Sequence, residues 1–539
     1  MPSKRPLFVI LPIVTIGALV TLCLVPPVSK DALVHHLAIP KLYLKRGAIY
    51  EMPYFPFSYY PMNIDLIYML SLKLGSDILP KIFHLFFGVL TAGAIFCYLR
   101  QRISPGYALF GFLFFLTIPV VVRLSVTAYV DLGLGFFSIL SLLLVLRWSE
   151  HRSRVFYLIC AGIAAGVAAG IKYNGLITFF LVFLLVIYFC VRDREQNEGY
   201  KKAFFNISLF LGISVILLSP WYVRNYIWTG NPIYPLYNSF FNPETAGGSS
   251  GIGIFHYRSV AFHESWWDIA LVPIRVFFQG QDGSARFFDG KLNPFLLILL
   301  PLAYLQATES WPVKREKAAF LWFAVTYLFI CFFTSNLKTR YIVPILPPLV
   351  ILATLGVNNG MRLAESLHNK FLSRCLQISM LGCVIIAFAL NLSYIVGQFK
   401  RISPFEYILG KVSRDEYVLK YVPEYRVIQF INANLAADSK ILFVLIGNRG
   451  YYCDRDYMPD MVRNRSLIES LLKEHERPAV IWRELRKRHI THLLININLF
   501  RKWAIATLDQ EQRARLKRFF LGYAKLLYLD NGYGLYRLR

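Results

Sequence analysis

The sequence VSKDALVHHLAIPKLYLKRGAIYEMPYFPFSYY occupies residues 28–60 and follows the first long apolar segment of the chain. It combines an aspartate, two histidines, several basic residues and many aromatic residues. This mixture is typical of a membrane surface, where amphipathic side chains keep one end in water. Asp31 lies near its start, shortly after two prolines. The stretch therefore marks the end of one membrane crossing, and the topology of the remaining chain can be worked out from it.

The composition is that of a polytopic membrane protein. Of 539 residues, 56% are hydrophobic and only 17% are charged, which is too apolar for an ordinary soluble protein. The net charge of +26 comes mostly from short basic clusters between apolar runs, as in cytoplasmic loops. This distribution argues against a nucleic-acid-binding protein, whose basic residues gather on one face. Seven of the eight cysteines lie in apolar segments, so no disulfide framework or metal motif follows.

The topology follows from hydrophobic length and from the basic loops, which stay on the cytoplasmic side. With Lys4 and Arg5 inside, the first apolar run has no small-residue cleavage site and is read as a retained crossing that puts Asp31 outside. The stretch 61–75 is short and charged, and only its reading as a surface or re-entrant helix keeps the later basic loops inside. About eleven crossings are then expected. They are 7–25, 80–99, 106–122, 129–147, 155–170, 175–191, 203–221, 293–307, 318–334, 341–357 and 375–396.

This topology divides the chain into two expected domains. Residues 1–399 form a helical membrane domain with outer loops at 26–79 and 222–292, and residues 400–539 form a soluble domain on the outer side. A loop as long as 222–292 is commonly a lid or a binding loop. A disordered connector is the alternative, although its many aromatic residues would be costly to leave in water. The sequence GGSSGIG at 247–253 is expected to be its most flexible part.

The soluble tail is predicted to be a small α/β domain. The apolar runs KILFVLIG (440–447) and ITHLLIN (490–496) predict buried strands, and ERPAVIWRELRKR (476–488) predicts a helix between them. The last residues predict a β-hairpin around the Asn-Gly pair at 531–532. The sequence GNRGYY at 447–452 does not have the spacing of a phosphate-binding glycine loop.

Two aspartates are the candidate catalytic carboxylates. Asp31 can serve as a general base or a metal ligand, and the alternative is that it caps a helix through 32–46. Asp131 opens an otherwise uncharged apolar segment, where an ionisable residue is costly and by default suggests a functional site. A capping role at the interface is the alternative for Asp131. Both residues lie at the outer level in the expected topology, so we expect them to contribute to one site.

Histidines and tyrosines near these positions are candidates for substrate contacts. His35 and His36 follow Asp31 by four and five residues, so they could position a substrate or bind a metal. Interfacial histidines without a ligand are the alternative. Several tyrosines at the expected outer surface could donate hydrogen bonds to a sugar or a phosphate, although such tyrosines are common at membrane interfaces. They are Tyr59, Tyr60, Tyr173 and Tyr341.

Three basic residues lie on the expected outer side, against the general charge bias. They are Lys172, Lys338 and Arg340. A phosphate group near the bilayer is the anion that they would suit best, because Arg and Lys form charge-assisted hydrogen bonds with phosphate oxygens. The alternative is that their side chains snorkel to lipid headgroups.

The order of these motifs resembles the polyprenyl-phosphate-sugar-dependent glycosyltransferases of the GT-C fold. This broad family includes the protein O-mannosyltransferases and the aminoarabinose transferase that modifies lipid A. The resemblance runs from the first crossing to about residue 357 and is followed by a soluble domain like those that some members carry. Its motifs are SKDALVHHLAIPKLYLKRG at 29–47, SYYPM at 58–62, AYVDLGLGFF at 128–137, GIKYNGL at 170–176 and KTRYIVPILPP at 338–348.

The resemblance implies an inverting transferase in the cytoplasmic (inner) membrane, which moves a sugar from a polyprenyl phosphate to a lipid, glycan or protein acceptor on the outer face. Asp31 would be the catalytic carboxylate and Asp131 the second acidic residue of the site. Arg340, with Lys338 and Lys172, would hold the leaving phosphate. Many members have an acidic pair in the first loop where this chain has Asp31-Ala32. Dependence on a divalent metal therefore stays open.

Two other classes of function fit less well. A transporter or flippase of lipid-linked sugars should place ionisable residues near the bilayer midplane and show a repeat between its halves. Here the ionisable residues gather at the outer ends of the crossings, and no repeat is visible in the sequence. A non-catalytic assembly or receptor protein would not need both Asp31 and Asp131.

Overall fold

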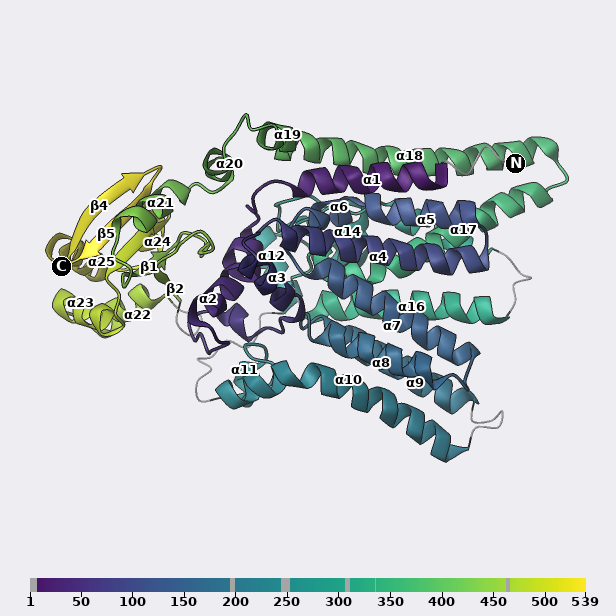
Figure 1. Cartoon of the computed structure of the whole chain (residues 1–539), viewed down its shortest axis with the longest axis horizontal. Helices are drawn as coiled ribbons and strands as arrows, with labels where there is room; N and C mark the ends of the chain where they lie inside the picture. The colour runs from purple at the N-terminus through teal and green to yellow at the C-terminus, as the bar shows by residue number, and fades with distance from the viewer. Residues whose placement is uncertain (1–6, 194–198, 244–252, 306–310, 335, 462–465) are drawn as a thin grey trace. The chain divides into compact units, whose positions relative to one another are not determined.

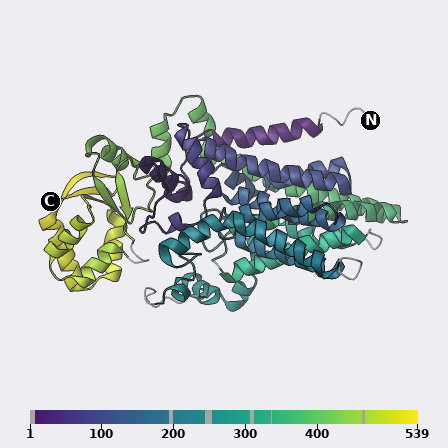
Figure 2. The ribbon, with the colours of Figure 1, turned by 60° about the horizontal axis from the view of Figure 1, so that its bottom comes forward.

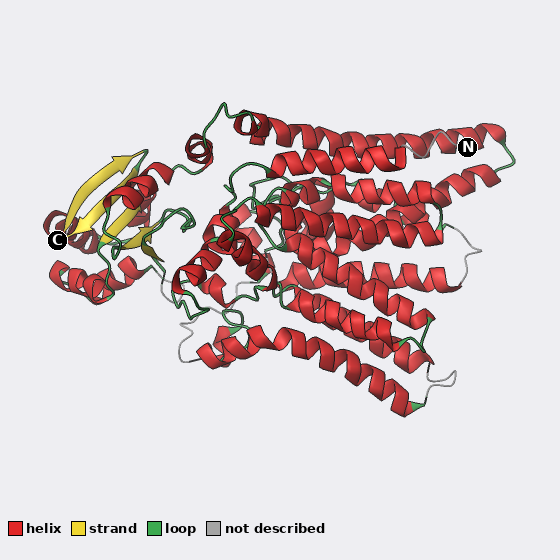
Figure 3. Cartoon of the chain, viewed as in Figure 1, coloured by secondary structure: helices red, strands yellow, loops and turns green. Residues whose placement is uncertain are grey.

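The computed structural model is mostly helical, with one five-stranded sheet near the C-terminus (Figure 3). The structure describes residues 7–193, 199–243, 253–305, 311–334, 336–461 and 466–539. The chain forms two compact units. The helical unit contains Met1–Leu24, Tyr60–Ile64 and Leu79–Pro404. The mixed unit contains Val25–Tyr59, Asp65–Ile78 and Phe405–Arg539.

The predicted polytopic helical fold is confirmed. Within the described residues, seven helices are long and apolar enough to cross a membrane, and a bent pair makes an eighth candidate (Figures 1 and 2). The seven are α4 (Leu79–Arg102), α7 (Asp131–Glu150), α9 (Gly175–Asp193), α10 (Tyr200–Thr229), α16 (Trp311–Thr334), η5 (Thr339–Ile345) continued by α17 (Leu346–Ser366), and α18 (Lys370–Ile402).

The remaining expected crossings correspond to shorter or broken helices. The bent pair turns by 64° between its two members. The pair is α5 (Pro105–Thr117) and α6 (Pro119–Ser125), and the shorter apolar helices are α1 (Leu7–Cys23), α8 (Val155–Ala169) and α15 (Phe295–Ile298) with η4 (Pro301–Tyr304). Each of the predicted apolar segments thus contains helix. Lys4 and Arg5, on which the expected orientation depends, lie outside the described residues.

The lengths of two helices could not be read from hydropathy alone. Helix α3 (Asn63–Lys73) has 11 residues, which span roughly 16 Å and are too few for a crossing. This length agrees with its reading as a surface or re-entrant helix. Helix α10 continues to Thr229, past the expected end at 221, although Pro220 lies inside it. It ends only at Gly230, which adopts the left-handed conformation (φ 69°) that favours glycine.

Helices α8 and α10 approach backbone to backbone. Gly162 and Gly166 are four residues apart on α8, the spacing that lets membrane helices pack closely. A Cβ atom on Gly166 would lie 2.7 Å from the Ser214 carbonyl oxygen and 2.9 Å from the Leu217 Cβ. The Ser214 hydroxyl donates a hydrogen bond to the Gly162 carbonyl oxygen (2.9 Å). These small residues therefore fix the contact between the two helices.

The described part of the long loop at 222–292 consists mainly of short helices. They are α11 (Asn238–Phe241), α12 (Ile254–Phe262), α13 (Trp266–Ala270) and α14 (Val272–Phe278). The Arg258 side chain is fully buried and donates two hydrogen bonds to the Glu264 carboxylate (2.6 and 2.9 Å). The part from α12 to α14 is therefore packed and ion-paired, whereas α11 has no buried residue. Residues 247–252 of the GGSSGIG sequence lie outside the described residues.

The predicted α/β tail is confirmed as a five-stranded sheet with the order β2-β1-β3-β5-β4. Strand β1 pairs in parallel with β2 and β3, while β5 pairs antiparallel with β3 and β4. The strands are β1 (Lys440–Val444), β2 (Asp456–Pro459), β3 (His492–Asn496), β4 (Ala524–Asp530) and β5 (Tyr533–Leu538). The expected strands at 440–447 and 490–496 and the hairpin at 531–532 are present, whereas β2 was not predicted.

Helices cover both faces of this sheet. On one face, Leu442 and Leu493 pack against α22, α23 and α25, and on the other face Ile441 and Phe443 pack against α21. Alternate residues of β1 thus point to opposite cores, as a strand buried on both faces requires. The described helices of the tail, from residue 404 onward, are α19 (Pro404–Ile408), α20 (Arg414–Tyr421), α21 (Tyr425–Asn434), α22 (Leu467–Glu474), α23 (Pro478–Lys487), α24 (Ile497–Thr507) and α25 (Gln510–Tyr523).

The segment 25–59, quoted at the outset, belongs to the mixed unit. It contains the π-helix η1 (Ala32–His36), α2 (Ala38–Arg46) and the short helix η2 (Pro56–Tyr59). The Lys41 ammonium donates hydrogen bonds to the Tyr451 carbonyl oxygen (2.8 Å) and to the Asp454 carboxylate (2.7 Å). Leu33 packs in an apolar cluster with residues of α20. Part of the expected outer loop 26–79 is thus built into the same compact unit as the tail.

Candidate functional site

A buried ion pair marks the start of α7. The Asp131 side chain is 1% exposed, and its Oδ1 atom lies 2.8 Å from the Lys172 ammonium. Lys172 lies in the turn between α8 and α9, so three helices converge on this pair. A buried carboxylate is tolerated only when it is paired and hydrogen-bonded, and the first turn of a helix favours a negative charge. The interaction with Lys172 therefore accounts for the ionisable residue in this apolar segment.

Arg340 and two aromatic rings complete the Asp131 cluster, which comprises Asp131, Lys172, Tyr129, Arg340 and Tyr341. The Arg340 guanidinium lies 5.3 Å from the centre of the Tyr129 ring and 5.4 Å from that of Tyr341. The Lys172 ammonium lies 4.8 Å from the same Tyr341 ring. These distances are within the range of cation–π attraction. One carboxylate is thus set against two cations, and the cluster carries a net charge of +1 that suits an anionic ligand.

Tyr60 and Tyr173 lie next to this cluster. Their ring centres are 4.9 Å apart. Burial, followed by the neighbouring Tyr341, raises the pKa of Tyr60 to about 12, so its hydroxyl stays neutral and can donate a hydrogen bond. The Tyr173 hydroxyl donates to the Tyr234 carbonyl oxygen (2.5 Å). Of the predicted tyrosines, Tyr60 and Tyr341 are therefore brought together with the predicted cations. Lys338 occupies the N-cap position of η5, two residues before Arg340, and its side chain makes no capping hydrogen bond.

His84 is a supporting residue that sequence reasoning missed. It is fully buried on α4, and its Nε2 atom accepts a hydrogen bond from the Leu132 backbone N–H (2.9 Å). Its Nδ1 atom lies 2.9 Å from the carbonyl oxygens of Leu124 and Thr127, which can only accept. This network assigns the proton to Nδ1 and a neutral ring. His84 thus holds the first turn of α7, and a polar residue within an apolar crossing was the signal that could have found it.

Asp31, in the mixed unit, immediately precedes the π-helix η1. Its side chain makes no capping hydrogen bond, so the capping role considered from the sequence is not observed. The helix expected through 32–46 is also interrupted, because η1 ends at His36 and α2 begins at Ala38. Short π-helical turns are rare and are found frequently at functional sites.

The other predicted residues of the mixed unit have structural neighbours. The His36 Nδ1 atom lies 2.8 Å from the Asp65 carboxylate, and both side chains are buried. The His35 ring stacks on Phe57, with centres 4.4 Å apart. The Tyr59 hydroxyl donates to Glu51 (2.7 Å). Within the described residues, no three His, Cys, Asp or Glu side chains are grouped so that they could hold a metal ion.

Comparisons with known proteins agree with this fold. Residues 55–229, which include Asp131 and Lys172, match the family model of dolichyl-phosphate-mannose-protein mannosyltransferases. The structure is similar to crystal structures of ArnT from Cupriavidus metallidurans. With the undecaprenyl-phosphate-bound form, 99% of this chain and 98% of that chain align at 14% identity and a TM-score of 0.58. With the apo form, 98% and 97% align at 16% identity and a TM-score of 0.56.

A more distant likeness connects the chain to an oligosaccharyltransferase from Archaeoglobus fulgidus in its apo form. This alignment covers 97% of this chain and 73% of that chain, at 12% identity and a TM-score of 0.50. No curated protein sequence matches the chain. The structural likenesses show the fold, and the match to a mannosyltransferase family is a separate signal in the sequence. Together these findings identify the chain as a membrane glycosyltransferase of the GT-C fold.

Proposed function

We propose that this glycosyltransferase moves a sugar from a polyprenyl phosphate to a lipid, glycan or protein acceptor on the outer face of the cytoplasmic membrane, with inversion at the sugar. The observation that carries the proposal is the buried Asp131–Lys172 pair with Arg340 beside it. Its net positive charge suits a lipid-linked phosphate. Two of the comparisons support this donor class. One ArnT structure is bound to undecaprenyl phosphate, and the matched family is named for dolichyl-phosphate-mannose.

In this proposal the Asp131 cluster receives the leaving phosphate. Negative charge develops on the phosphate as the bond to the sugar breaks, and fixed cations in a low-dielectric site stabilise that charge. Lys172 has three N–H donors, so it can keep its hydrogen bond to Asp131 while donating to a phosphate oxygen. Asp131 then acts by orienting Lys172, and Arg340 offers a planar fork that can bind two oxygens at once. Lys338 is proposed as a further cation for the same group.

Asp31 is proposed as the base that serves the acceptor. Its carboxylate would take the proton from the acceptor hydroxyl or amine while that atom attacks the anomeric carbon. The bond from this carbon to the phosphate oxygen breaks in the same displacement, and the electron pair leaves with the phosphate. The π-helical turn that directly follows Asp31 supports a chemical role, because such turns are found frequently at functional sites. His35, His36, Tyr59, Tyr60 and Tyr341 are proposed to line the substrate path.

The decisive experiment replaces Asp131 by Asn in the purified full-length protein and measures transfer from a polyprenyl-phosphate sugar. The Asn side chain has nearly the same shape as that of Asp but no negative charge to attract the Lys172 ammonium. We therefore expect the rate of transfer to fall by at least about 100-fold, which corresponds to an increase of roughly 2.7 kcal/mol in the activation barrier. Asp438→Asn is the matched control, since Asp438 is exposed and far along the chain from the cluster. Transfer by Asp131→Asn at the rate of the unmodified protein would refute the proposed role of the cluster.

A further inference from the structure

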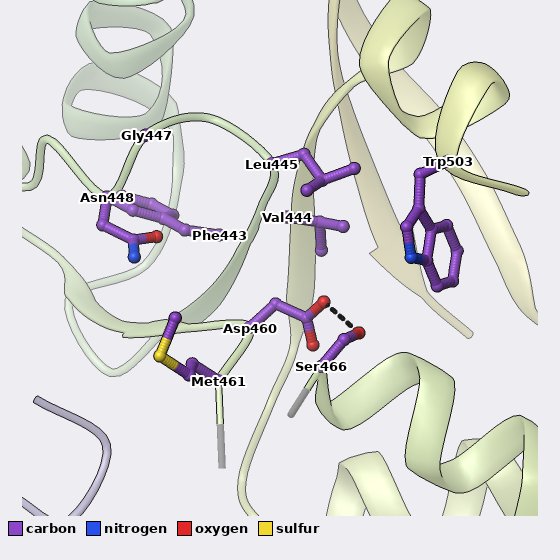
Figure 4. A pocket seen from close by; sticks show the side chains of 9 residues that line it. All are labelled: Phe443, Val444, Leu445, Gly447, Asn448, Asp460, Met461, Ser466 and Trp503. Carbon is purple, nitrogen blue, oxygen red and sulfur yellow. Dashed lines mark hydrogen bonds between the residues drawn. The ribbon is translucent and has the colours of Figure 1, made fainter. Parts of the chain in front are cut away.

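The mixed unit contains a cavity that the proposed chemistry does not use. It has a volume of about 300 Å³ and lies at the carboxyl ends of β1 and β2, next to α24 (Figure 4). Strand β1 is flanked by β2 on one side and β3 on the other, and both run parallel to it. In open α/β sheets, ligands bind in the crevice at the carboxyl ends of the strands, where the chain passes from one side of a central strand to the other. The cavity lies at this kind of position.

One wall of the cavity is aromatic. Trp503 on α24 lies on one side of it, and Asn448 and Met461 lie on the other (Figure 4). The indole is stacked on Phe500, with ring centres 5.3 Å apart, so its orientation is fixed by packing. A held tryptophan ring offers a flat apolar surface that is rigid before any ligand arrives.

The floor of the cavity carries hydrogen-bonding groups. The Asp460 carboxylate accepts hydrogen bonds from the Ser466 hydroxyl (2.6 Å) and from the Ile468 backbone N–H (3.0 Å). These bonds fix the carboxylate at the start of α22, while an ionised carboxylate can accept about four hydrogen bonds in all. Figure 4 shows Asp460 and Ser466 between the indole on one side and Asn448 on the other. The cavity therefore combines an apolar face with oriented oxygen acceptors and an amide.

The backbone of the loop after β1 is also unusual. Leu445 (φ 55°) and Asn448 (φ 58°) adopt the left-handed conformation, together with Gly447 (φ 77°). For leucine this conformation is strained, and strain of this kind is concentrated at ligand-binding and active sites. The strained loop supplies three of the residues that line the cavity. Its geometry supports a binding function for the cavity.

The lining determines the class of ligand. The nine residues that form the wall, all of them in the described part of the chain, include the carboxylate of Asp460, the hydroxyl of Ser466 and the amide of Asn448 beside the Trp503 indole. A flat ring with one apolar face and hydroxyl groups at its edge matches both the indole and the acceptors. A volume of about 300 Å³ is at the lower end of the range for ligand sites and suits a unit of one or two sugar rings.

We propose that this cavity binds a neutral saccharide unit of the acceptor. Its role with the acceptor rests on the proposed glycosyltransferase reaction, whereas binding of a sugar ring can be measured without that reaction. The probes are methyl α-D-mannopyranoside and methyl β-D-glucopyranoside, each added to the purified full-length protein and followed by saturation-transfer NMR. We expect saturable binding of at least one of them in the millimolar range or tighter.

Three variants locate the binding. Trp503→Ala should weaken it by at least about tenfold, because the stacking surface is lost, and Trp503→Phe should keep it within about threefold. Trp482→Ala is the matched control, since Trp482 lies on α23 in the same unit and donates its indole N–H to the Arg539 carbonyl oxygen outside the cavity. Asp460→Asn should retain measurable binding, because an amide can still bond to hydroxyl groups and also caps a helix.

The outcomes separate this proposal from the catalytic one. No binding of either probe, or equal binding by Trp503→Ala and the unmodified protein, would overturn it. A third probe, methyl β-D-glucosaminide, tests for a cation site: if it alone binds and Asp460→Asn abolishes that binding, the proposal of a neutral saccharide is also overturned. Asp131→Asn should bind the probes normally while it fails to transfer sugar, so failure of the catalytic proposal would leave the saccharide site standing.

Discussion

Arg340 is the residue whose role can be tested most directly, because its guanidinium lies 5.3 and 5.4 Å from the centres of two tyrosine rings and close to a buried carboxylate. If it holds the donor phosphate, Arg340→Ala should raise the KM for the lipid-linked donor by at least about tenfold and change the KM for the acceptor by less than about twofold. Arg340→Lys should recover only part of the loss, because an ammonium is a point charge without the planar fork. Initial rates with each substrate varied in turn provide the measurement. Equal effects on both KM values would contradict the phosphate role.

His492 predicts a pH dependence of the tail. Burial, followed by the cations Arg537 and Arg486, lowers the pKa of His492 from 6.5 to about 4. As the pH falls from 6.5, the unfolded chain therefore binds a proton before the folded one does, and folded stability decreases until the pH is below 4. One pKa unit corresponds to about 1.4 kcal/mol, so the total loss is about 3.5 kcal/mol at most. His492 thus contributes stability that is fully present only above pH 6.5.

The measurement compares the unmodified protein with His492→Gln at pH 7 and at pH 5. Hydrogen exchange in peptides that cover β1 and β3 of the full-length protein reports local stability, and comparison at equal pH removes the intrinsic effect of pH on exchange. The unmodified protein should lose about 2 kcal/mol of protection between these pH values relative to the variant. A parallel change in both proteins would mean that other groups control the effect.

The candidate site was partly predictable at the scale of single residues. Asp131 and the outer cations stand out because charge is rare and costly in apolar segments. Their pairing was not predictable, since Lys172 is 41 positions from Asp131 and only the packing of α7, α8 and α9 brings them together. Tyr59 and His36 were predicted as substrate contacts, and the structure adds the partners Glu51 and Asp65, which no local spacing indicated.

At the scale of elements, the contact between α8 and α10 depends on the missing side chain of Gly166. Gly166→Leu would push a branched side chain into the backbone of α10 at Ser214. We expect it to separate the two helices and to lower the thermal midpoint of the purified protein by several degrees, since overpacking typically costs about 1–3 kcal/mol. Gly212→Leu is the control, because a Cβ on Gly212 of α10 meets no atom within 4 Å. Equal effects of both changes would show that the close contact is not the cause.

The elements that were predicted correctly have strong local signals. Strands β1 and β3 contain the apolar runs ILFV and LLI, and the hairpin has an Asn-Gly turn in which both residues adopt a positive φ (45° and 78°). Strand β2 escaped prediction because it has only four residues, DYMP, and lies at the sheet edge. The break of the helix at His36 has a local signal that was not used, because Pro40 has no N–H to donate to the His36 carbonyl oxygen and its ring clashes with that oxygen in a regular helix. It coincides with the burial of Leu33 against α20, a long-range contact that sequence patterns do not contain.

At the scale of the whole molecule, the question that matters for the reaction is on which side of the membrane each segment lies. The expected orientation comes from the basic loops, such as Arg152 and Arg154 between α7 and α8, which should be cytoplasmic. A donor phosphate that is presented at the outer face requires the other ends of these helices, with Asp131 and Lys172, to be outside. The proposed reaction and the charge bias therefore require the same topology, with Asp131 and Lys172 on the outer side.

Single cysteines in a cysteine-free background test this topology. Ser153→Cys probes the loop between α7 and α8, Lys73→Cys probes the end of α3, and Asp438→Cys probes the tail, and all three positions are exposed. In intact cells a membrane-impermeant thiol reagent should label positions 73 and 438, because both are expected outside, and should label position 153 only after permeabilisation. Labelling of position 153 but not of position 438 in intact cells would show that the orientation is the opposite of the expected one. The Asp131 cluster would then lie at the cytoplasmic face. A polyprenyl-phosphate sugar that is made from a nucleotide sugar would in that case be used on the same side of the membrane on which it is made.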